Sequence, residues 1–201
     1  MSDTSQNSVT PNADSIAKAA LNFKSKGPAP VHLWNPPFCG DLDMRIARDG
    51  TWFYLGTPIG RKPLVKLFSS VLRRDGDDYF LVTPVEKVGI TVEDAPFVAV
   101  DFNVNGEGRQ QKITFTTNVD EQIIAGSDNP VRLERDATTG EPSPYVKVRA
   151  NLEALIDRKS FYRLVDLGVP HDHNGEGWFG IWSNGQFFPF IRVAEISKFL
   201  C

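Results

Sequence analysis

Two glycines and two basic residues stand close together in Gly56-Thr57-Pro58-Ile59-Gly60-Arg61-Lys62-Pro63, a composition suited to phosphate. The phosphate-binding loop of nucleotide hydrolases has a longer spacing between its glycines and then a Lys followed by Ser or Thr. Here Pro63 supplies neither a hydroxyl nor an amide N–H, so we reject that activity. A weaker interpretation stays open, in which Arg61 and Lys62 hold an anion at a helix N-terminus. The alternative is that both are solvated.

The tripeptide His171-Asp172-His173 has the residue types of a metal site. A protein metal site needs several convergent ligands, and the chain has only one further histidine, His32. The tripeptide also falls between Gly168 and Gly175, as a loop would. We therefore predict a solvated turn, no metal site and no cofactor.

Nucleophilic catalysis lacks a candidate set in this sequence. Ser69 and Ser70 fall inside a predicted helix, and Cys39 has a proline-rich neighbourhood without a nearby basic group. Acid–base chemistry stays open as the alternative function, a hydrolase or lyase. Its candidate carboxylates are Asp41, Asp43, Asp49, Glu86, Glu93 and Asp94, which exposed strand ends explain equally well.

Basic residues concentrate in the segment 31–76, where seven Arg and Lys stand against four Asp. Trp34, Trp52 and Tyr54 are interleaved with them, which favours an anionic or aromatic ligand on this surface. A tryptophan in a strand is nevertheless more often part of a core. The predicted binding residues are Arg45, Arg48, Trp52, Arg61, Lys62, Glu86 and Lys87. A carboxylate between the basic groups would instead make Arg61 and Lys62 structural.

Hairpin signals recur from Asp43 onward and predict a mostly β protein. Asx-Gly pairs at Asp49, Asp75, Asn105, Asn174 and Asn184 tolerate the positive φ of tight turns. The predicted strands between them are 44–47, 51–55, 78–82, 98–104, 112–116, 145–148, 178–182 and 186–191. In the strand 98–104, alternation predicts that Val98, Val100, Phe102 and Val104 share the inner face.

Helical spacing predicts helices over 63–74 and 158–168, and a short one that Asp14 or Ser15 caps before Gly27. The first two begin alike, Arg-Lys at 61 and again at 158. Each of these two helices follows a predicted hairpin and is followed by an Asx-Gly turn and then a strand. Agreement over hairpin, helix and strand indicates an internal duplication.

The composition is that of an ordinary globular protein, with 41% hydrophobic residues and a formal net charge of -3. This acidic balance disfavours nucleic-acid binding. The N-terminus lacks an apolar signal-peptide core, and no segment has the length of a membrane span. We therefore expect a cytoplasmic protein with no membrane contact and with Cys39 and Cys201 reduced; a disulfide between them is the alternative.

The run WNPPFCGDLDMRIARDGTWFYLGTPIGRKPLVKLF resembles an uncharacterised bacterial family, the domain of unknown function number twelve-eighty-five. The similarity continues through PYVKVRANLEALIDRKSFYRLVDLG and WFGIWSNGQFFPF, which together place it over residues 25–192. The resemblance implies a two-part α+β fold with related halves, the second superficially like a pleckstrin-homology barrel. It also implies a ligand site between the halves and a role in signalling, and it implies no catalytic activity.

We therefore predict an α+β, mostly β fold made of two related halves, each a curled antiparallel sheet with one helix. The expected divisions are a disordered tail and short helix (1–26), a proline-rich strap anchored by Trp34 and Phe38 (27–40), a first half with its bridging hairpin (41–117) and a second half (118–201). The predicted function is a ligand- or partner-binding regulatory module, with a small anionic ligand or a protein partner. The oligomeric state stays open.

Overall fold

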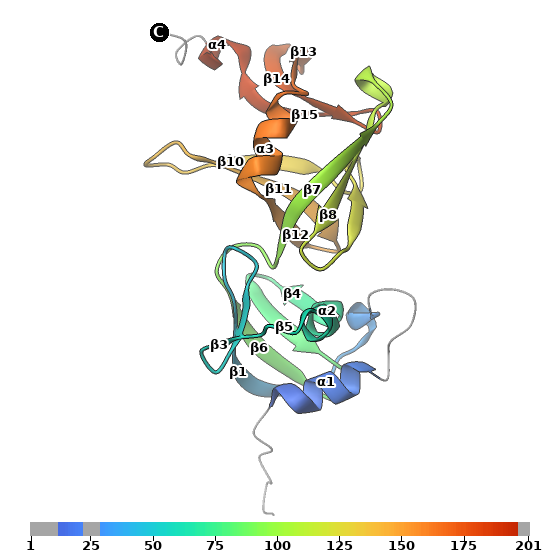
Figure 1. Ribbon diagram of the computed structural model, residues 1–201, viewed down its shortest axis with the longest axis vertical. Coiled ribbons are helices and arrows are strands. Elements are labelled where there is room, and N and C mark those ends of the chain that lie inside the picture. Colours follow the sequence, from blue (N-terminus) through green and yellow to red (C-terminus); the bar gives the residue numbers. More distant parts are fainter. Residues whose placement is uncertain (1–11, 22–28, 197–201) are drawn as a thin grey trace, which may run out of the picture. The chain divides into compact units, whose positions relative to one another are not determined.

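The computed structural model of the protein describes residues 12–21 and 29–196 (Figure 1). The chain divides between Glu93 and Asp94 into two compact units, which are described one at a time. The division precedes the hairpin 97–117 that we expected to belong to the first half. The hairpin lies in the second unit because its strand β7 (Phe97–Asn105) pairs both with β8 (Lys112–Thr117) and with β12 (Leu152–Ile156).

The first unit is a six-stranded sheet with the order β3-β2-β1-β6-β5-β4. Its strands are β1 (Phe38–Ile46), β2 (Trp52–Tyr54), β3 (Thr57–Pro58), β4 (Leu72–Asp75), β5 (Asp78–Val82) and β6 (Lys87–Val92). All neighbours are antiparallel except β1 and β6, which are parallel. The parallel pair brings residues from opposite ends of the unit side by side.

The helix α1 (Ala13–Leu21) buries Ile16 and Ala20, as their spacing predicts. Its cap is Asn12, whose Oδ1 accepts a 2.8 Å hydrogen bond from the amide of Ser15, and not Asp14 or Ser15. An asparagine in this position satisfies an amide that the helix itself leaves unpaired. The predicted stop at Gly27 and the predicted disorder of the first residues lie outside the described residues.

The helix α2 (Lys62–Ser70) is shorter than predicted. Val71 is its C-cap, and the expected last turn is instead the strand β4, in which Arg73 and Arg74 pair with Phe80 and Tyr79. Hairpin pairing with β5 across the Gly76 turn (φ 63°) satisfies this backbone better than a frayed helix end would. The predicted strap (27–40) holds a 3-10 turn, η1 (Val31–Leu33), and its last residues, from Phe38 onward, belong to β1.

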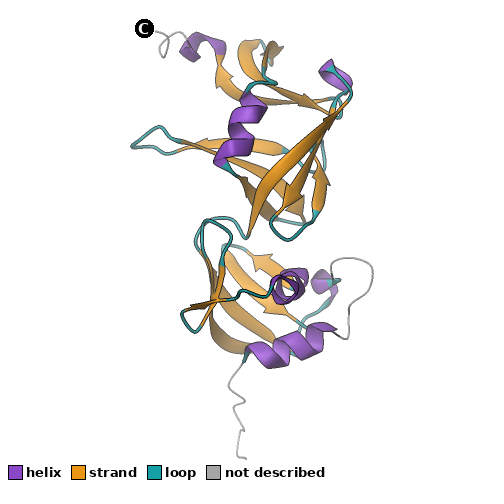
Figure 2. Ribbon diagram, viewed as in Figure 1, coloured by secondary structure: helices purple, strands orange, loops and turns teal. Residues whose placement is uncertain are grey.

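The second unit has a six-stranded sheet, β10-β11-β12-β7-β8-β9, and a three-stranded sheet, β13-β14-β15 (Figure 2). Its further elements are β9 (Gln122–Ile124), β10 (Val131–Arg135), β11 (Pro142–Arg149), α3 (Arg158–Val165), β13 (Val169–His173), β14 (Glu176–Ser183), β15 (Gln186–Arg192), the 3-10 turn η2 (Gly108–Gln110) and α4 (Val193–Ile196). The helix α3 contacts both sheets, through β7 and β14. Phe97, Phe102, Phe115 and Ile181 are among the buried side chains of this core.

The two halves are related, as the sequence repeat predicted. In the first, α2 is followed by the antiparallel meander β4-β5-β6; in the second, α3 is followed by the antiparallel meander β13-β14-β15. The first turn of each meander has its glycine at positive φ, Gly76 and Gly175. Each half also contains one parallel strand pair, β1 with β6 and β12 with β7.

Two predictions about faces are wrong. In β7, Val100 is 41% exposed, because a register shift between Ala99 and Asp101 turns the strand at this residue. Val104, opposite Ile113 near the end of the strand, is 39% exposed. In the strap, Phe38 is 57% exposed and anchors nothing by burial. Among the described residues, no helix has the length and apolar character that crossing a membrane requires.

Candidate functional site

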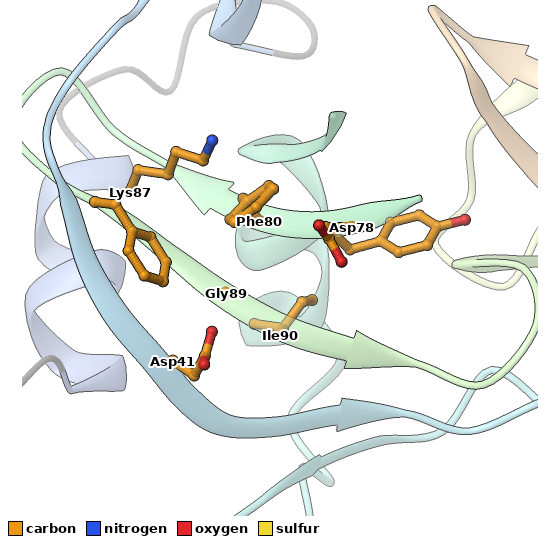
Figure 3. A pocket seen from close by; sticks show the side chains of 8 residues that line it. Asp41, Asp78, Phe80, Lys87, Gly89 and Ile90 are labelled. Atoms are coloured by element: carbon orange, nitrogen blue, oxygen red, sulfur yellow. The ribbon is translucent and has the colours of Figure 1, made fainter. Parts of the chain in front are cut away.

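A cavity of about 410 Å³ opens on the first sheet, over strands β1, β5 and β6 (Figure 3). Register shows which face it lies on. Phe80 is opposite Gly89, so both point to one side, whereas their neighbours Leu81 and Val88 are buried on the other. The lining residues are Phe38, Asp41, Asp78, Tyr79, Phe80, Lys87, Gly89 and Ile90.

A bulge in β1 directs Asp41 into this cavity. The pairing of β1 with β6 shifts register on both sides of Asp41, and Gly40 just before it has a φ of 104°. Bulges of this kind redirect a side chain without ending the strand. Asp41 lies so close to Gly89 that a Cβ built on the glycine would stand 2.1 Å from Asp41 Oδ1. The missing side chain at position 89 therefore makes room for the carboxylate.

The aromatic part of the cavity comes from two strands. Phe38 of β1 and Phe80 of β5 meet edge to face, with ring centroids 6.1 Å apart. Lys87 Nζ lies 3.8 Å from the centre of the Phe80 ring, within the range of a cation–π contact. Because Phe38 remains more than half exposed, its ring presents apolar surface to anything that enters.

The ammonium group of Lys87 already has a protein anion. Asp75 Oδ2 accepts hydrogen bonds of 2.8 Å from both Lys87 Nζ and Arg73 Nη2. Partial burial alone would raise the pKa of Asp75, but the two cationic donors outweigh it and lower the pKa below its usual range. Arg73 in turn donates to the carbonyls of Val31 and Trp34, which fixes the strap beside the sheet.

Asp41 and Asp78 have no such partners. Neither carboxylate forms an ion pair or side-chain hydrogen bond within the described part of the chain, and no hydrogen bond joins the two. Figure 3 shows both of them, with Phe80 and Lys87, arranged around Gly89. The cavity thus combines aromatic surface with two uncompensated negative charges, an arrangement suited to a cation that carries an apolar body.

The predicted binding residues are dispersed, and only Lys87 lies in this cavity. Arg45 instead forms an ion pair with Glu93 and stacks over Phe53, its Cζ 4.3 Å from the ring centre. Glu93 also accepts a 3.0 Å hydrogen bond from the backbone amide of Arg48. These contacts hold the turn between β1 and β2 against the end of β6.

Trp52, predicted as a ligand platform, is a core residue with 1% exposure. Its ring is stacked on Phe68 of α2 at a centroid distance of 6.2 Å. Strand β2 has only three residues and places Trp52, and not Phe53, on the buried face. Nε1 of Trp52 is buried without a hydrogen-bond partner in the described residues.

Arg61 and Lys62 are exposed at the start of α2. The backbone there offers little to an anion, because the amides of Leu64 and Val65 both donate to the carbonyl of Arg61, and Pro63 has no N–H. Arg61 lines a different hollow of the first unit, at the side of α1. Glu86 reaches the same helix, where it accepts a 3.4 Å hydrogen bond from Ser15 Oγ.

Several of the acids suggested for acid–base chemistry accept hydrogen bonds from other groups of the protein. The backbone amide of Thr51 and then its hydroxyl donate to Asp49 and lower the pKa of that carboxyl, which disfavours it as a proton donor. Asp94 accepts a 2.8 Å hydrogen bond from the hydroxyl of Tyr145. Burial, reinforced by Asp94, raises the pKa of Tyr145 to about 12.

The segment His171-Asp172-His173 is a strand, β13, and not the predicted turn. The ring of His171 packs against two aromatic side chains, with its centroid 4.9 Å from that of Trp182 and 4.8 Å from that of Phe187. No group of three or more metal-binding side chains occurs in residues 12–21 and 29–196. Cys39 is a free thiol, and Cys201 lies outside the described residues.

Comparison with known proteins assigns the chain to a family. Residues 29–95 match the N-terminal domain and residues 96–190 the C-terminal domain of the proteins of unknown function DUF1285. The chain belongs to the DUF1285 family. The boundary between the two DUF1285 domains falls within two residues of the division between the structural units.

Two solved structures resemble this DUF1285 chain. A DUF1285 family protein from Silicibacter pomeroyi DSS-3 is 64% identical, covers 90% of this chain and 97% of its own, and has a TM-score of 0.83. A DUF1285 family protein from Shewanella baltica OS155 is 29% identical, covers 62% of this chain and 91% of its own, with a TM-score of 0.50. Curated proteins provide no match.

The sequence of this DUF1285 protein predicts only part of the cavity lining. Asp41 was among the candidate carboxylates, but Asp78, Phe80 and Gly89 were not singled out. They meet Asp41 because β1 and β6 are parallel, a pairing between segments far apart in the chain that leaves no local signal. The available hint was Gly89, an isolated glycine inside an apolar strand, which is typical of a close approach by another group.

Proposed function

We propose that this DUF1285 protein is a binding module whose first unit takes a small ligand with a protonated amine on an aromatic or aliphatic body. The observation that carries the proposal is the pair of uncompensated carboxylates, Asp41 and Asp78, in a cavity with an aromatic wall. The sequence favoured an anionic ligand on a basic surface. The basic residues of that surface lie apart, and Lys87 is held by Asp75, which favours a cation here.

The expected mode of binding follows from the lining. The ammonium group would donate charge-assisted hydrogen bonds to the two carboxylates, and the apolar body would lie against Phe38 and Phe80. A lysine side chain of a protein partner offers the same chemistry, which keeps a regulatory role through a partner within this proposal. A signalling role and a pleckstrin-homology-like second half stay predictions from the family resemblance.

The test uses two probes of one shape and different charge, 2-phenylethylamine and 2-phenylethanol. A ligand that binds only the native state raises the melting temperature, so the amine should raise it and the alcohol should not. Titration calorimetry then measures Kd for the amine. An equal response to the neutral alcohol would show that Asp41 and Asp78 contribute nothing.

The matched variants are Asp41→Asn, Asp78→Asn and the control Asp43→Asn. All three remove one negative charge from an exposed aspartate, but Asp43 does not line the cavity. A charge-assisted hydrogen bond is worth roughly 1.5–3 kcal/mol, so each cavity variant should weaken the amine by about tenfold or more. If Asp43→Asn weakens binding as much, net charge and not the cavity attracts the amine.

A further inference from the structure

A second hollow of the first unit, also about 410 Å³, lies between α1, the start of α2 and the turn from β2 to β3. Its lining is mainly apolar and shares no residue with the cavity on the other face. The apolar members are Ala13, Ala17, Pro58, Ile59, Leu64 and Phe68, and the polar ones are Asp14, Tyr54, Thr57 and Arg61.

Two charged residues, Asp14 and Arg61, line this hollow, and only Asp14 is stabilised by its position in a helix. Asp14 is in the first turn of α1, where a carboxylate is stabilised by the positive end of the helix dipole. Arg61 is the N-cap of α2, where a cation is disfavoured for the same reason, and it makes no side-chain cap. Arg61 has no ion pair with any described residue, Asp14 included. Its positive charge at the rim of an apolar hollow is therefore uncompensated.

We propose that this hollow binds a small amphipathic carboxylate. The carboxylate group would pair with the guanidinium of Arg61, whose planar donors suit two oxygen atoms at once. The hydroxyls of Tyr54 and Thr57 offer further donors, and the apolar chain would lie against Leu64, Ile59 and the alanines of α1. The site and its ligand are independent of the amine-binding cavity, so either proposal can fail alone.

The hollow also links its ligand to the docking of α1. This helix has nine residues, too few to be stable in water without packing, and it docks through Ile16 and Ala20. Because α1 provides one wall and α2 another, a bound carboxylate contacts both helices together. Binding should therefore strengthen the attachment of α1 to the unit.

Octanoate is the probe, with 1-octanol as the uncharged control of equal chain length. Octanoate should raise the melting temperature and give a measurable Kd by calorimetry, whereas 1-octanol should not. The paired variants are Arg61→Gln and Lys62→Gln, which remove the same charge from neighbouring exposed residues, of which only Arg61 lines the hollow. Loss of a charged partner should weaken octanoate roughly tenfold in Arg61→Gln and leave Lys62→Gln unchanged. Equal binding by 1-octanol, or equal losses in both variants, would overturn the proposal.

Two further measurements separate a site in the hollow from binding elsewhere. Ala17→Leu fills the hollow from a helical position that tolerates leucine, so it should fold normally and no longer bind octanoate. Trypsin cleavage at Lys18, an exposed residue of α1, should slow in the presence of octanoate in the wild type but not in Arg61→Gln. Unchanged octanoate binding by Ala17→Leu, or unchanged cleavage at Lys18, would contradict the assignment.

Discussion

At the scale of single residues, Gly89 controls whether Asp41 can enter the cavity. A methyl group at this position would overlap Asp41 Oδ1, at 2.1 Å, and press on Asp41 Cγ at 3.2 Å. We expect Gly89→Ala to displace the carboxylate, to weaken 2-phenylethylamine about as much as Asp41→Asn does, and to cost roughly 1–3 kcal/mol of unfolding free energy. Urea denaturation measures the second effect.

The control for this substitution is Gly60→Ala. Gly60 also lacks a positive φ, and a Cβ there would meet no atom within 4 Å. Its stability and its affinity for the amine should stay at wild-type values. A Gly89→Ala protein that binds 2-phenylethylamine normally would show that Asp41 does not need the space above the glycine.

The ion pairs of Asp75 predict a pH dependence of stability. Hydrogen bonds from Lys87 and Arg73 lower the pKa of Asp75 in the folded protein, against the opposing effect of its partial burial. A depressed pKa means that this contribution is present above the unfolded value of about 4 and is lost as the pH falls below it. Urea denaturation between pH 3 and 7 should show a smaller decrease of the unfolding free energy at low pH for Asp75→Asn than for the wild type. Since Asp75 is partly exposed, the difference should be small.

Residue types alone do not show which of the predicted binding residues face the core, for a definite physical reason. Trp52 and Phe53 are adjacent aromatic residues in a three-residue strand, and the sequence does not say which of them faces the core. The structure buries Trp52 and leaves Phe53 beneath Arg45. Lys87 was a predicted binding residue because it follows a strongly apolar strand, and it lines the cavity over β1, β5 and β6. Its partner Asp75 is in β4, two hairpin turns earlier in the chain, and the two residues meet only in the folded sheet.

At the scale of elements, the two equivalent helices begin differently. The Asp157 side chain caps α3 by accepting a 2.7 Å hydrogen bond from the amide of Ser160, whereas Arg61 gives α2 no side-chain cap. Asp157→Ala should therefore cost about 1 kcal/mol of unfolding free energy, the usual value of such a cap. Chemical denaturation followed by circular dichroism measures it.

Asp166 provides the control at the other end of the same helix. It is the C-cap of α3 and exposed, where a carboxylate faces the negative end of the helix dipole. Asp166→Ala should leave stability unchanged or raise it slightly. A loss as large as that of Asp157→Ala would show that removing either carboxylate destabilises this helix, so that the Asp157 effect could not be assigned to the cap.

Strands whose own residue types favour a strand beside an Asx-Gly turn were predicted well, and strands whose residue types favour a helix or a loop were not. Asx-Gly turns located the hairpin strands β5, β8, β14 and β15 within a few residues. The strand β4 was assigned to a helix because Val71 and Leu72 continue the apolar stripe of α2. The strand β13 was predicted as a loop because the segment falls between Gly168 and Gly175, and its proline and aspartate are poor strand formers. Pairing with β14 overrides that local preference.

At the scale of the whole molecule, the repeat identified from the sequence describes how each core is built. Each half places one helix before a three-stranded antiparallel meander, and each contains one parallel strand pair. The sequence located the helices of the repeat but not the division between the halves. The hairpin β7–β8 follows the first half in the chain, yet its hydrogen bonds are made to β12 and β9 of the second.

This pairing yields a test of the division with two truncated proteins. Residues 94–201 keep the whole sheet β10-β11-β12-β7-β8-β9, whereas residues 118–201 lose β7 and β8 from its middle, and with them the buried Phe97, Phe102 and Phe115. Removing buried aromatic residues costs roughly 3–5 kcal/mol each, which together exceeds the stability of a typical domain. We therefore expect 94–201 to unfold in one cooperative thermal transition, and 118–201 to show none. Calorimetry and circular dichroism measure both. A cooperative transition in 118–201 would mean that the hairpin is dispensable for this core. The boundary between the two halves would then lie at residue 117.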